Sequence, residues 1–328
     1  MQQQITQRDV WKAKHRIASV VNKTPLIHSQ ELSKLSGANV YLKLENLTVT
    51  GSFKIRGAAN RILKLSQEQR ERGITTFSTG NFGMSVAYMA KRLGIPATIC
   101  ISERVPSAKV KVLEEAGAEL EVYGKSQDEA EKRSYQLGKE NGWAVIHPFD
   151  DPDIIAGQGT MGLEVLEELP ETDMVIAGLS GGGLHAGLGT ALKAADPDLS
   201  LLGVSTEKGP AMLASIRAGK PVTVQEHDTL ADSLLGGIGL DNKYTFKLVQ
   251  QYVDDILLIS EKEIAEGMSY MFHHHRMMIE GAAAAGIGAL LNHRINPSTN
   301  IVLVISGGSV DPQTVMDIAA KQKGWADE

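Results

Sequence analysis

Short apolar runs rich in β-branched residues alternate with longer amphipathic segments along almost the whole chain. The runs have the length and composition of buried strands, and they lie at residues 40–44, 74–78, 97–101, 119–123, 144–146, 174–177, 200–204 and 301–305. The segments between them have the periodicity of helices, as at residues 85–93, 107–116, 126–140, 159–168 and 185–195. This alternation predicts βαβ units, and therefore an α/β protein whose mainly parallel sheets are flanked by helices.

The number of predicted strands bears on the domain organisation. A single compact sheet seldom holds so many strands, whereas a chain of 328 residues can bury two cores. We therefore expect two α/β lobes with a cleft between them. Only about one helix's length of chain follows Ser306-Gly307-Gly308, so we expect no appended regulatory domain.

Composition and charge exclude several classes of function. A formal net charge of -6 leaves no basic excess to neutralise phosphates, so we expect no nucleic-acid partner. No apolar run reaches the length of about 18 residues that spans a membrane, and the polar start Met1–Gln4 lacks the core of a signal peptide. We expect a soluble, cytoplasmic protein. The single cysteine, Cys100, rules out an internal disulfide, and its apolar surroundings favour a buried structural thiol.

The segment Thr50–Ala58 contains a lysine in an unusual setting. One interpretation is a loop entering a helix, with Ser52 as the N-cap and Lys54 solvated in the first turn. A cation there opposes the helix dipole, however. A lysine partly desolvated in a cleft has a lowered pKa, and its neutral amine can form a Schiff base with an aldehyde. In that case the neighbouring Phe53 can pack on a flat cofactor ring.

The segment Ser180–Gly187 directly follows a predicted strand. Its glycines Gly181, Gly182 and Gly183 expose backbone N–H groups at the start of a helix, which is a seat for phosphate. The same segment fits the dinucleotide-binding pattern, with Glu207 about 20 residues further on. On its own it favours a nicotinamide-dependent dehydrogenase.

Two further features are weighed by their geometry. Ser78–Gly83 forms a turn between a strand and a helix, and it is either a plain capped turn or a pocket for a substrate carboxylate. His273-His274-His275 suggests a metal, but consecutive residues on a helix point about 100° apart and cannot converge on one ion. We expect these histidines on a partly exposed helical face.

Taken together, the motifs resemble those of fold type II pyridoxal-phosphate enzymes, which have the tryptophan synthase β-like fold. The serine/threonine dehydratase and serine racemase family is the most similar. The resemblance runs from about Thr24 to Gly308, and its motifs are Lys43-Leu44-Glu45-Asn46, Gly51–Ala58, Asp150-Asp151-Pro152, Ala156–Thr160, Gly181–Gly183, Glu280-Gly281-Ala282 and Ser306-Gly307-Gly308. Ser126–Ala130 and Leu230–Asn242 resemble the hydroxyectoine utilisation dehydratase branch of that family.

The resemblance implies roles for individual residues. Lys54 would carry pyridoxal phosphate and act as the catalytic base, and Thr79 would be a second catalytic group. The other cofactor-binding residues would be Phe53, Asn81, Gly181, Gly182, Gly183, Leu184, Glu280 and Ser306. The substrate carboxylate would be held by Ser78, Thr79, Asn81 and the amides near Phe82.

The resemblance also implies a reaction and an assembly. The reaction is β-elimination of water from a small L-hydroxy amino acid, followed by loss of ammonia to give a 2-oxo acid. A large cofactor-binding domain would comprise residues 1–55 and 149–328, and a small mobile domain residues 56–148. The family further implies a homodimer and, with Glu207 as a ligand, a monovalent or divalent cation.

Departures from the family pattern keep the substrate open. Phe82 stands where relatives usually carry His, and Met84 where they carry Gln, so this corner is more apolar. Threonine, serine, a hydroxyaspartate and a hydroxylated diaminobutyrate derivative all remain candidates. A hydroxyl at Thr79 resembles the serine racemases, so we expect a minor racemase activity. The rival interpretations are an NAD-dependent dehydrogenase and a two-lobed binding protein without catalytic activity.

Overall fold

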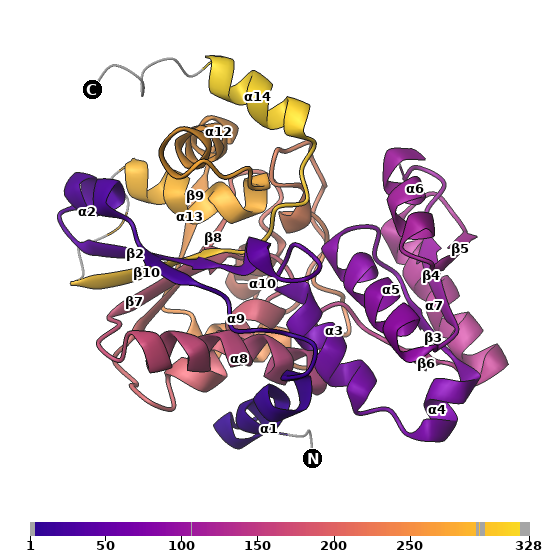
Figure 1. Cartoon of the computed structure of the whole chain (residues 1–328). Helices are drawn as coiled ribbons and strands as arrows, with labels where there is room; N and C mark the ends of the chain where they lie inside the picture. Colours follow the sequence, from indigo (N-terminus) through magenta and orange to yellow (C-terminus); the bar gives the residue numbers. More distant parts are fainter. Residues whose placement is uncertain (1–3, 106, 293–294, 296–298, 322–328) are drawn as a thin grey trace.

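The strands form two separate sheets. The computed structural model describes residues 4–105, 107–292, 295 and 299–321 (Figure 1). The larger sheet has the order β1-β2-β10-β7-β8-β9. These strands are β1 Leu26–His28, β2 Asn39–Leu44, β7 Met174–Gly178, β8 Ser200–Thr206, β9 Asp255–Ile259 and β10 Asn300–Ile305. β1 pairs antiparallel with β2, and the other neighbours pair in parallel.

The smaller sheet is parallel throughout and has the order β5-β4-β3-β6. Its strands are β3 Ile74–Thr76, β4 Ala97–Ile101, β5 Glu119–Val122 and β6 Ala144–Val145. The prediction of an α/β protein with mainly parallel sheets is therefore confirmed. The predicted domain boundaries at residues 55/56 and 148/149 stay a prediction, although the smaller sheet lies wholly between them.

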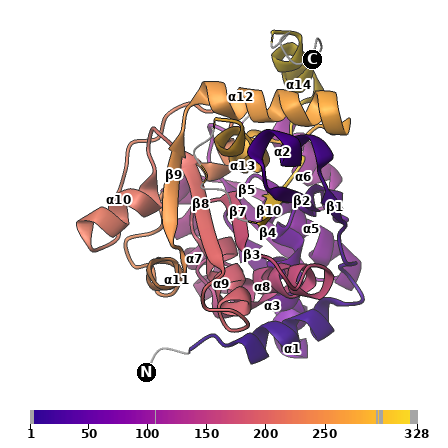
Figure 2. The ribbon, with the colours of Figure 1, turned by 90° about the vertical axis from the view of Figure 1, so that its left-hand side faces the viewer.

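Helices cover both faces of the larger sheet. Those outside the smaller lobe are α1 Gln7–Ile17, α2 Gln30–Ser36, α8 Pro152–Glu168, α9 Gly183–Leu192, α10 Ala211–Ala218, α11 Thr245–Tyr252, α12 Glu261–Tyr270, α13 Gly281–Leu291 and α14 Pro312–Lys321. In Figures 1 and 2, α8 and α9 lie on one face of the sheet and α12 and α13 on the other. No helix among the described residues is both long and apolar enough to cross a membrane.

The helices of the smaller lobe surround its sheet on the right of Figure 1. They are α4 Gln67–Arg72, α5 Asn81–Leu93, α6 Ser107–Glu115 and α7 Gln127–Asn141. Helix α3, Lys54–Leu63, lies between the two lobes in this view. Short helices η1 Glu45–Leu47, η2 Asp232–Leu234 and η3 Met271–His275 complete the described elements.

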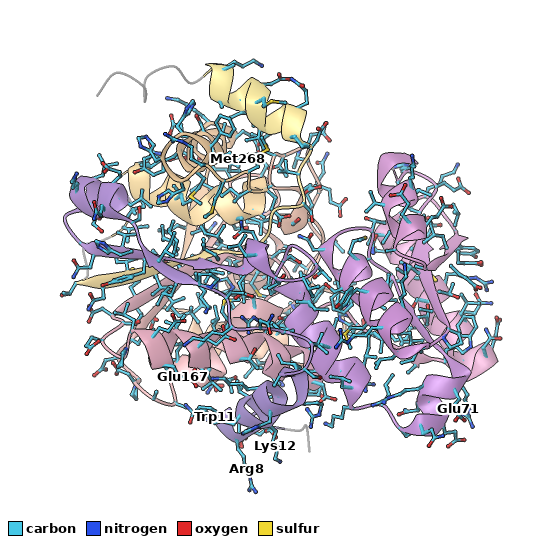
Figure 3. All side chains as sticks on the ribbon, viewed as in Figure 1. Arg8, Trp11, Lys12, Glu71, Glu167 and Met268 are labelled. Atoms are coloured by element: carbon cyan, nitrogen blue, oxygen red, sulfur yellow. The ribbon has the colours of Figure 1, made fainter. Side chains whose placement is uncertain are left out.

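The largest core cluster joins the larger sheet to α12 and α13. Met268, labelled in Figure 3, is 1% exposed and belongs to this cluster. Two glycines let the helices approach closely: a Cβ on Gly267 would lie 2.5 Å from the carbonyl oxygen of Ala284, and one on Gly288 would lie 2.2 Å from that of Glu263. Close packing of this kind explains why α13 consists mostly of Ala and Gly.

The outer faces carry charged pairs. Trp11 and Lys12 on α1 lie on the same side of the molecule as Glu167 on α8, and Lys14 forms an ion pair with Glu167. Glu71 on α4 lies at the opposite end (Figure 3). Such exposed pairs contribute little to stability.

Several element limits differ from those predicted. Strands β1 and β9 were not predicted, and both are edge strands whose side chains are mostly only partly buried. Helix α8 begins at Pro152 rather than at residue 159, because the Asp151 carboxylate accepts hydrogen bonds from two backbone N–H groups and Pro152 occupies the first turn. Helix α5 begins at Asn81 rather than at residue 85, directly after Gly80.

Candidate active site

One pocket of about 370 Å³ collects residues from both lobes. Its lining includes residues at or after the ends of β3, β6, β7 and β10, namely 77–82, 147–149, 178, 180–185 and 306. In parallel α/β sheets the carboxyl ends of the strands are where ligands bind. Every cofactor and substrate residue predicted from the sequence lines this pocket, with the exception of the cation ligand Glu207.

Lys54 is the first residue of α3, and backbone pairing of the two residues before it fixes its position. Ser52 forms an isolated antiparallel bridge with Gly307, and the Phe53 N–H donates to the Ser306 carbonyl at 3.0 Å. Burial lowers the pKa of Lys54 to about 8, although the charge of Glu280 opposes this shift. The Lys54 Nζ lies 4.9 Å from the centre of the Phe53 ring. The interpretation of Ser52 as the N-cap is wrong, because Phe53 occupies that position.

A buried ion-pair network anchors the first turn of α3. The guanidinium of Arg56 donates to both oxygens of Glu45, at 2.7 and 2.8 Å, and to both oxygens of Glu164, at 2.6 and 2.8 Å. The Lys43 ammonium donates to Glu164 at 2.8 Å and to the Thr24 carbonyl at 2.7 Å. The four charged side chains are at most 5% exposed. Two cations and two anions therefore balance within the protein, two residues from Lys54.

The glycine turn after β7 is shaped by its neighbours as well as by its open backbone. Gly182 has a positive φ of 85° and is the N-cap of α9, with no side-chain capping bond. A Cβ on Gly181 would lie 2.7 Å from the Phe149 ring, and one on Gly183 would lie 2.9 Å from the Phe149 side chain. The turn therefore requires glycine at these positions, and it presents backbone N–H groups at the positive end of a helix.

Asn81 and Glu280 form a buried polar pair in the pocket. The Asn81 amide nitrogen donates to both carboxylate oxygens of Glu280, at 3.0 and 2.9 Å. Burial raises the pKa of Glu280 to about 7, while this hydrogen bond opposes the rise. The Asn81 Oδ1 is buried and has no partner within the described part of the chain. Asn81 can therefore accept a hydrogen bond from a bound group.

The turn before α5 contributes the residues predicted to hold the substrate carboxylate. Ser78 and Thr79 line the pocket and are partly exposed, whereas Phe82 is 2% exposed and packs into the core of the smaller lobe. A Cβ on Gly83 would lie 2.1 Å from the Ser78 carbonyl oxygen, so the turn folds tightly onto the helix. Met84 lies outside the pocket lining, so of these two departures from the family pattern Phe82 is the one that reaches the pocket.

Sequence reasoning did not single out several pocket residues. His147 and Phe149 follow β6, Gln127 and Glu131 lie on α7, and residues 232–237 and 239 come from the loop after α10. The sequence does carry a signal for some of these residues, because Ser126–Ala130 and Leu230–Asn242 resemble a branch of the family. That both segments reach one pocket depends on the tertiary structure.

Other predicted features lie away from this chemistry. Glu207 is exposed, and the described residues contain no group of three or more potential metal ligands. His273, His274 and His275 lie on η3, a π-helix, and are partly exposed, as expected for a helical face. Cys100 is fully buried, and burial raises the pKa of its thiol.

The residues present suit pyridoxal phosphate. Lys54 offers an amine with a lowered pKa, the glycine turn offers a cradle that any Cβ would fill, and the unpartnered Asn81 Oδ1 offers an acceptor. The fold and the pocket thus define a class: α/β proteins in which a lysine and a glycine turn suited to phosphate line one pocket between two mainly parallel sheets.

Comparison with known proteins agrees with this class. Residues 17–307 match the model of the pyridoxal-phosphate dependent enzyme family, and the chain belongs to that family. A Sinorhizobium fredii protein with the provisional name threonine dehydratase is 46% identical over 301 residues, covering 92% of this chain and 91% of that protein. The L-threonine ammonia-lyase of Thermotoga maritima is 39% identical over 317 residues, covering 97% and 79%. Maize serine racemase superposes with a TM-score of 0.90 at 33% identity, covering 97% of both chains.

Proposed function

We propose that this protein is a pyridoxal-phosphate-dependent ammonia-lyase that removes water and then ammonia from a small L-hydroxy amino acid of the threonine or serine type. The observation that carries the proposal is the presence of the Lys54 amine and the Gly181–Gly183 turn in one pocket. Relatives named as threonine dehydratase and L-threonine ammonia-lyase, which align over at least 92% of this chain, support the reaction.

The cofactor would be held by residues from both lobes. The backbone N–H groups of Gly181–Gly183, with Leu184, would bind its phosphate, and Phe53 would pack on its ring. By family analogy Asn81, whose amide donates to Glu280, would contact its phenolic oxygen. Ser306, 5% exposed, would lie near its ring nitrogen by the same analogy. When bound, pyridoxal phosphate supplies an aldehyde for amines and an electron sink for the bond broken at the α-carbon.

The residues of this chain then bind substrate and move protons. Ser78, Thr79 and the backbone amides at the start of α5 hold the substrate carboxylate, because a helix N-terminus favours an anion. A pKa of about 8 leaves part of Lys54 neutral near physiological pH, so its Nζ can take the α-proton. Phe82 closes one side of the pocket against water.

Replacing Lys54 by alanine tests the proposal. Lys54→Ala should abolish ammonia release and the yellow colour of the purified protein, while the circular dichroism spectrum stays unchanged. Lys64→Ala is the matched control. Lys64 is the C-cap of the same helix, but it is exposed and its ammonium pairs with the Asp153 carboxylate at 2.7 Å. Ammonia release by the Lys54→Ala variant at the wild-type rate would contradict the proposal.

A racemase side activity is a second candidate function, and one observation favours it. Thr79 lines the pocket together with Lys54, and by analogy with the serine racemases its hydroxyl would act on the face of the α-carbon opposite the lysine. The β-branch of Thr79 restricts its rotamers, and we expect a minor activity. Thr79→Ala should remove racemisation measured by chiral chromatography, and unchanged racemisation would exclude this role.

Finer expectations complete the proposal. Ser126–Ala130 and Leu230–Asn242 contribute residues to the pocket, which supports a place in the hydroxyectoine utilisation branch and a hydroxylated diaminobutyrate derivative as substrate. A cytoplasmic homodimer with a mobile small domain is proposed by family analogy, as is a cation near Glu207. Light scattering tests the dimer, and activity with and without added cations tests the cation.

The dehydrogenase interpretation loses its support. Its acidic residue, Glu207, is exposed and lies outside the pocket lining. Its glycine turn shares the pocket with Lys54. Hydride transfer does not require a lysine amine at that place. The family match also favours the lyase.

A further inference from the structure

The active-site pocket is strongly acidic on the side contributed by α7 and by the loop around η2. Four carboxylates line it in addition to Glu280, namely Asp128, Glu131, Glu226 and Asp232. Of the described residues in the lining, Lys54 is the only lysine or arginine. Glu131 is the most enclosed of the four, with a side chain 33% exposed, whereas the other three residues are exposed.

His147 holds a fixed position beside Glu131. Its Nδ1 accepts hydrogen bonds from the backbone N–H groups of Phe149, at 3.2 Å, and of Asp150, at 2.8 Å. The ring packs edge-on against Phe77 and Phe149, with centroids 5.3 and 4.7 Å apart. Burial lowers the pKa of His147 to about 4, so the ring is neutral at physiological pH.

The orientation of this ring determines the charge near Glu131. Because Nδ1 of His147 is an acceptor, the ring proton is on Nε2, which lies 3.9 Å from the Glu131 Oε1. At this distance the two groups are neighbours without a hydrogen bond between them, and the neutral ring does not cancel the charge of the carboxylate. Once it has lost its proton, above a pKa of about 7, Glu131 therefore presents a negative charge to whatever occupies the pocket.

We propose that Glu131, beside the neutral His147, is a specificity-determining residue that selects hydroxy amino acids whose side chain ends in an ammonium group and rejects those that end in a carboxylate. This inference rests on the proposed function and deepens it by naming the substrate class. Lys54 has to be a neutral base for the α-proton when substrate is bound, and the described lining contains no other lysine or arginine to pair with a second carboxylate. A terminal ammonium, in contrast, gains a charge-assisted hydrogen bond at Glu131.

Three substrates that differ only in the group on carbon 3 provide the test. Threonine carries a methyl group there, 3-hydroxyaspartate a carboxylate, and 2,4-diamino-3-hydroxybutanoate an aminomethyl group. Ammonia release by the wild-type holoenzyme should give kcat/KM in the order diamino compound, threonine, hydroxyaspartate. Charged hydrogen bonds of the usual strength predict a ratio of about tenfold or more between the first two.

Glu131→Gln should lower the ratio of kcat/KM for the diamino compound over threonine by about tenfold or more, because it keeps the shape but removes the charge. Glu131→Lys should reverse the preference toward hydroxyaspartate. Glu140→Gln is the matched control, since Glu140 is an exposed carboxylate on the same helix outside the pocket lining. It should leave all three rates unchanged.

The pH dependence gives a second readout. Burial and the charges of Asp128 and Asp241 raise the pKa of Glu131 to about 7, while Lys132 opposes the shift. The other groups near it, His147 and Tyr135, stay neutral, since burial moves their pKa values to about 4 and about 12. The wild-type ratio should rise with pH through about 7, and this rise should be absent in Glu131→Gln. Groups common to both substrates, such as Lys54, cancel in the ratio.

The possible failures are distinguishable. If threonine is deaminated but Glu131→Gln and Glu140→Gln give the same substrate ratio as the wild type, the specificity role of Glu131 is wrong and the proposed function stands. If the holoenzyme releases ammonia from none of the three compounds, the proposed function fails, and this inference fails with it.

Discussion

Replacing Glu45 by glutamine tests whether the buried network around Arg56 stabilises the helix that begins with Lys54. Glu45 is 0% exposed and accepts two hydrogen bonds from Arg56. Glutamine preserves the volume, but it leaves Glu164 as the one buried carboxylate opposite Arg56 and Lys43, with the partly exposed Glu168 3.6 Å from Lys43. Arg56 stays charged in the folded protein. Burial alone would lower the pKa of its guanidinium, but Glu45 and Glu164 outweigh this effect and raise the pKa above its ordinary value.

The expected loss follows from leaving a charge buried without its partner. Such a loss is typically about 3–5 kcal/mol, which for a chain of 328 residues corresponds to a fall in melting temperature of roughly 4–7 °C. Thermal unfolding followed by circular dichroism measures it, with urea unfolding as a check. Glu68→Gln is the matched control, because Glu68 pairs with Arg72 on the exposed face of α4, where a pair contributes about 0.5 kcal/mol or less.

A compensated variant sharpens this test. Lys43→Met removes the surplus cation, so adding it to Glu45→Gln should recover part of the lost stability. The two substitutions should therefore be strongly non-additive. The reasoning about charge balance is refuted if the free energies of unfolding of Glu45→Gln and of the Glu68→Gln control agree within about 0.5 kcal/mol. It is also refuted if the effects of Glu45→Gln and Lys43→Met on that free energy are additive.

Three further predictions follow from the geometry of the pocket and the core. Gly181→Ala should weaken pyridoxal phosphate binding by roughly 10–100-fold in an absorbance titration, since its Cβ would lie 2.7 Å from the Phe149 ring. Adding Phe149→Ala should restore part of the affinity. Without cofactor, the contribution of Glu280 to stability should fall as pH rises from 4.5 to about 7, because folded Glu280 keeps a proton that unfolded Glu280 releases. The difference in unfolding free energy between the wild type and Glu280→Gln should therefore fall over this range, and a difference independent of pH would contradict the assignment. Cys100, buried and with a raised pKa, should react with a thiol reagent only on unfolding, and rapid labelling of the native protein would show otherwise.

Much of the architecture was predictable because it is encoded locally. Buried parallel strands such as β7 and β10 are continuous apolar runs, and the turns after them carry glycine or hydroxyl residues. Lys54 was noticed because a cation at a helix start is unfavourable, and the structure shows the burial that lowers its pKa. Edge strands β1 and β9 lack this signal, since their side chains are mostly only partly buried.

The acidic side of the pocket was not predictable in the same way. Glu131 and His147 lie 16 positions apart in the sequence, and only the packing of α7 beside β6 brings them within 3.9 Å. The ring tautomer of His147 depends on backbone N–H groups whose direction no sequence pattern specifies. Glu280 and Asn81 are 199 positions apart and meet only through the convergence of the two lobes.

The central claim is that the amine of Lys54 binds pyridoxal phosphate. Borohydride reduction of the purified holoenzyme, followed by proteolysis and mass spectrometry, tests it most directly. The account predicts a single stable phosphopyridoxyl adduct on the peptide that contains Lys54. An adduct on a different lysine, or a cofactor that dialyses away unchanged after reduction, would contradict it.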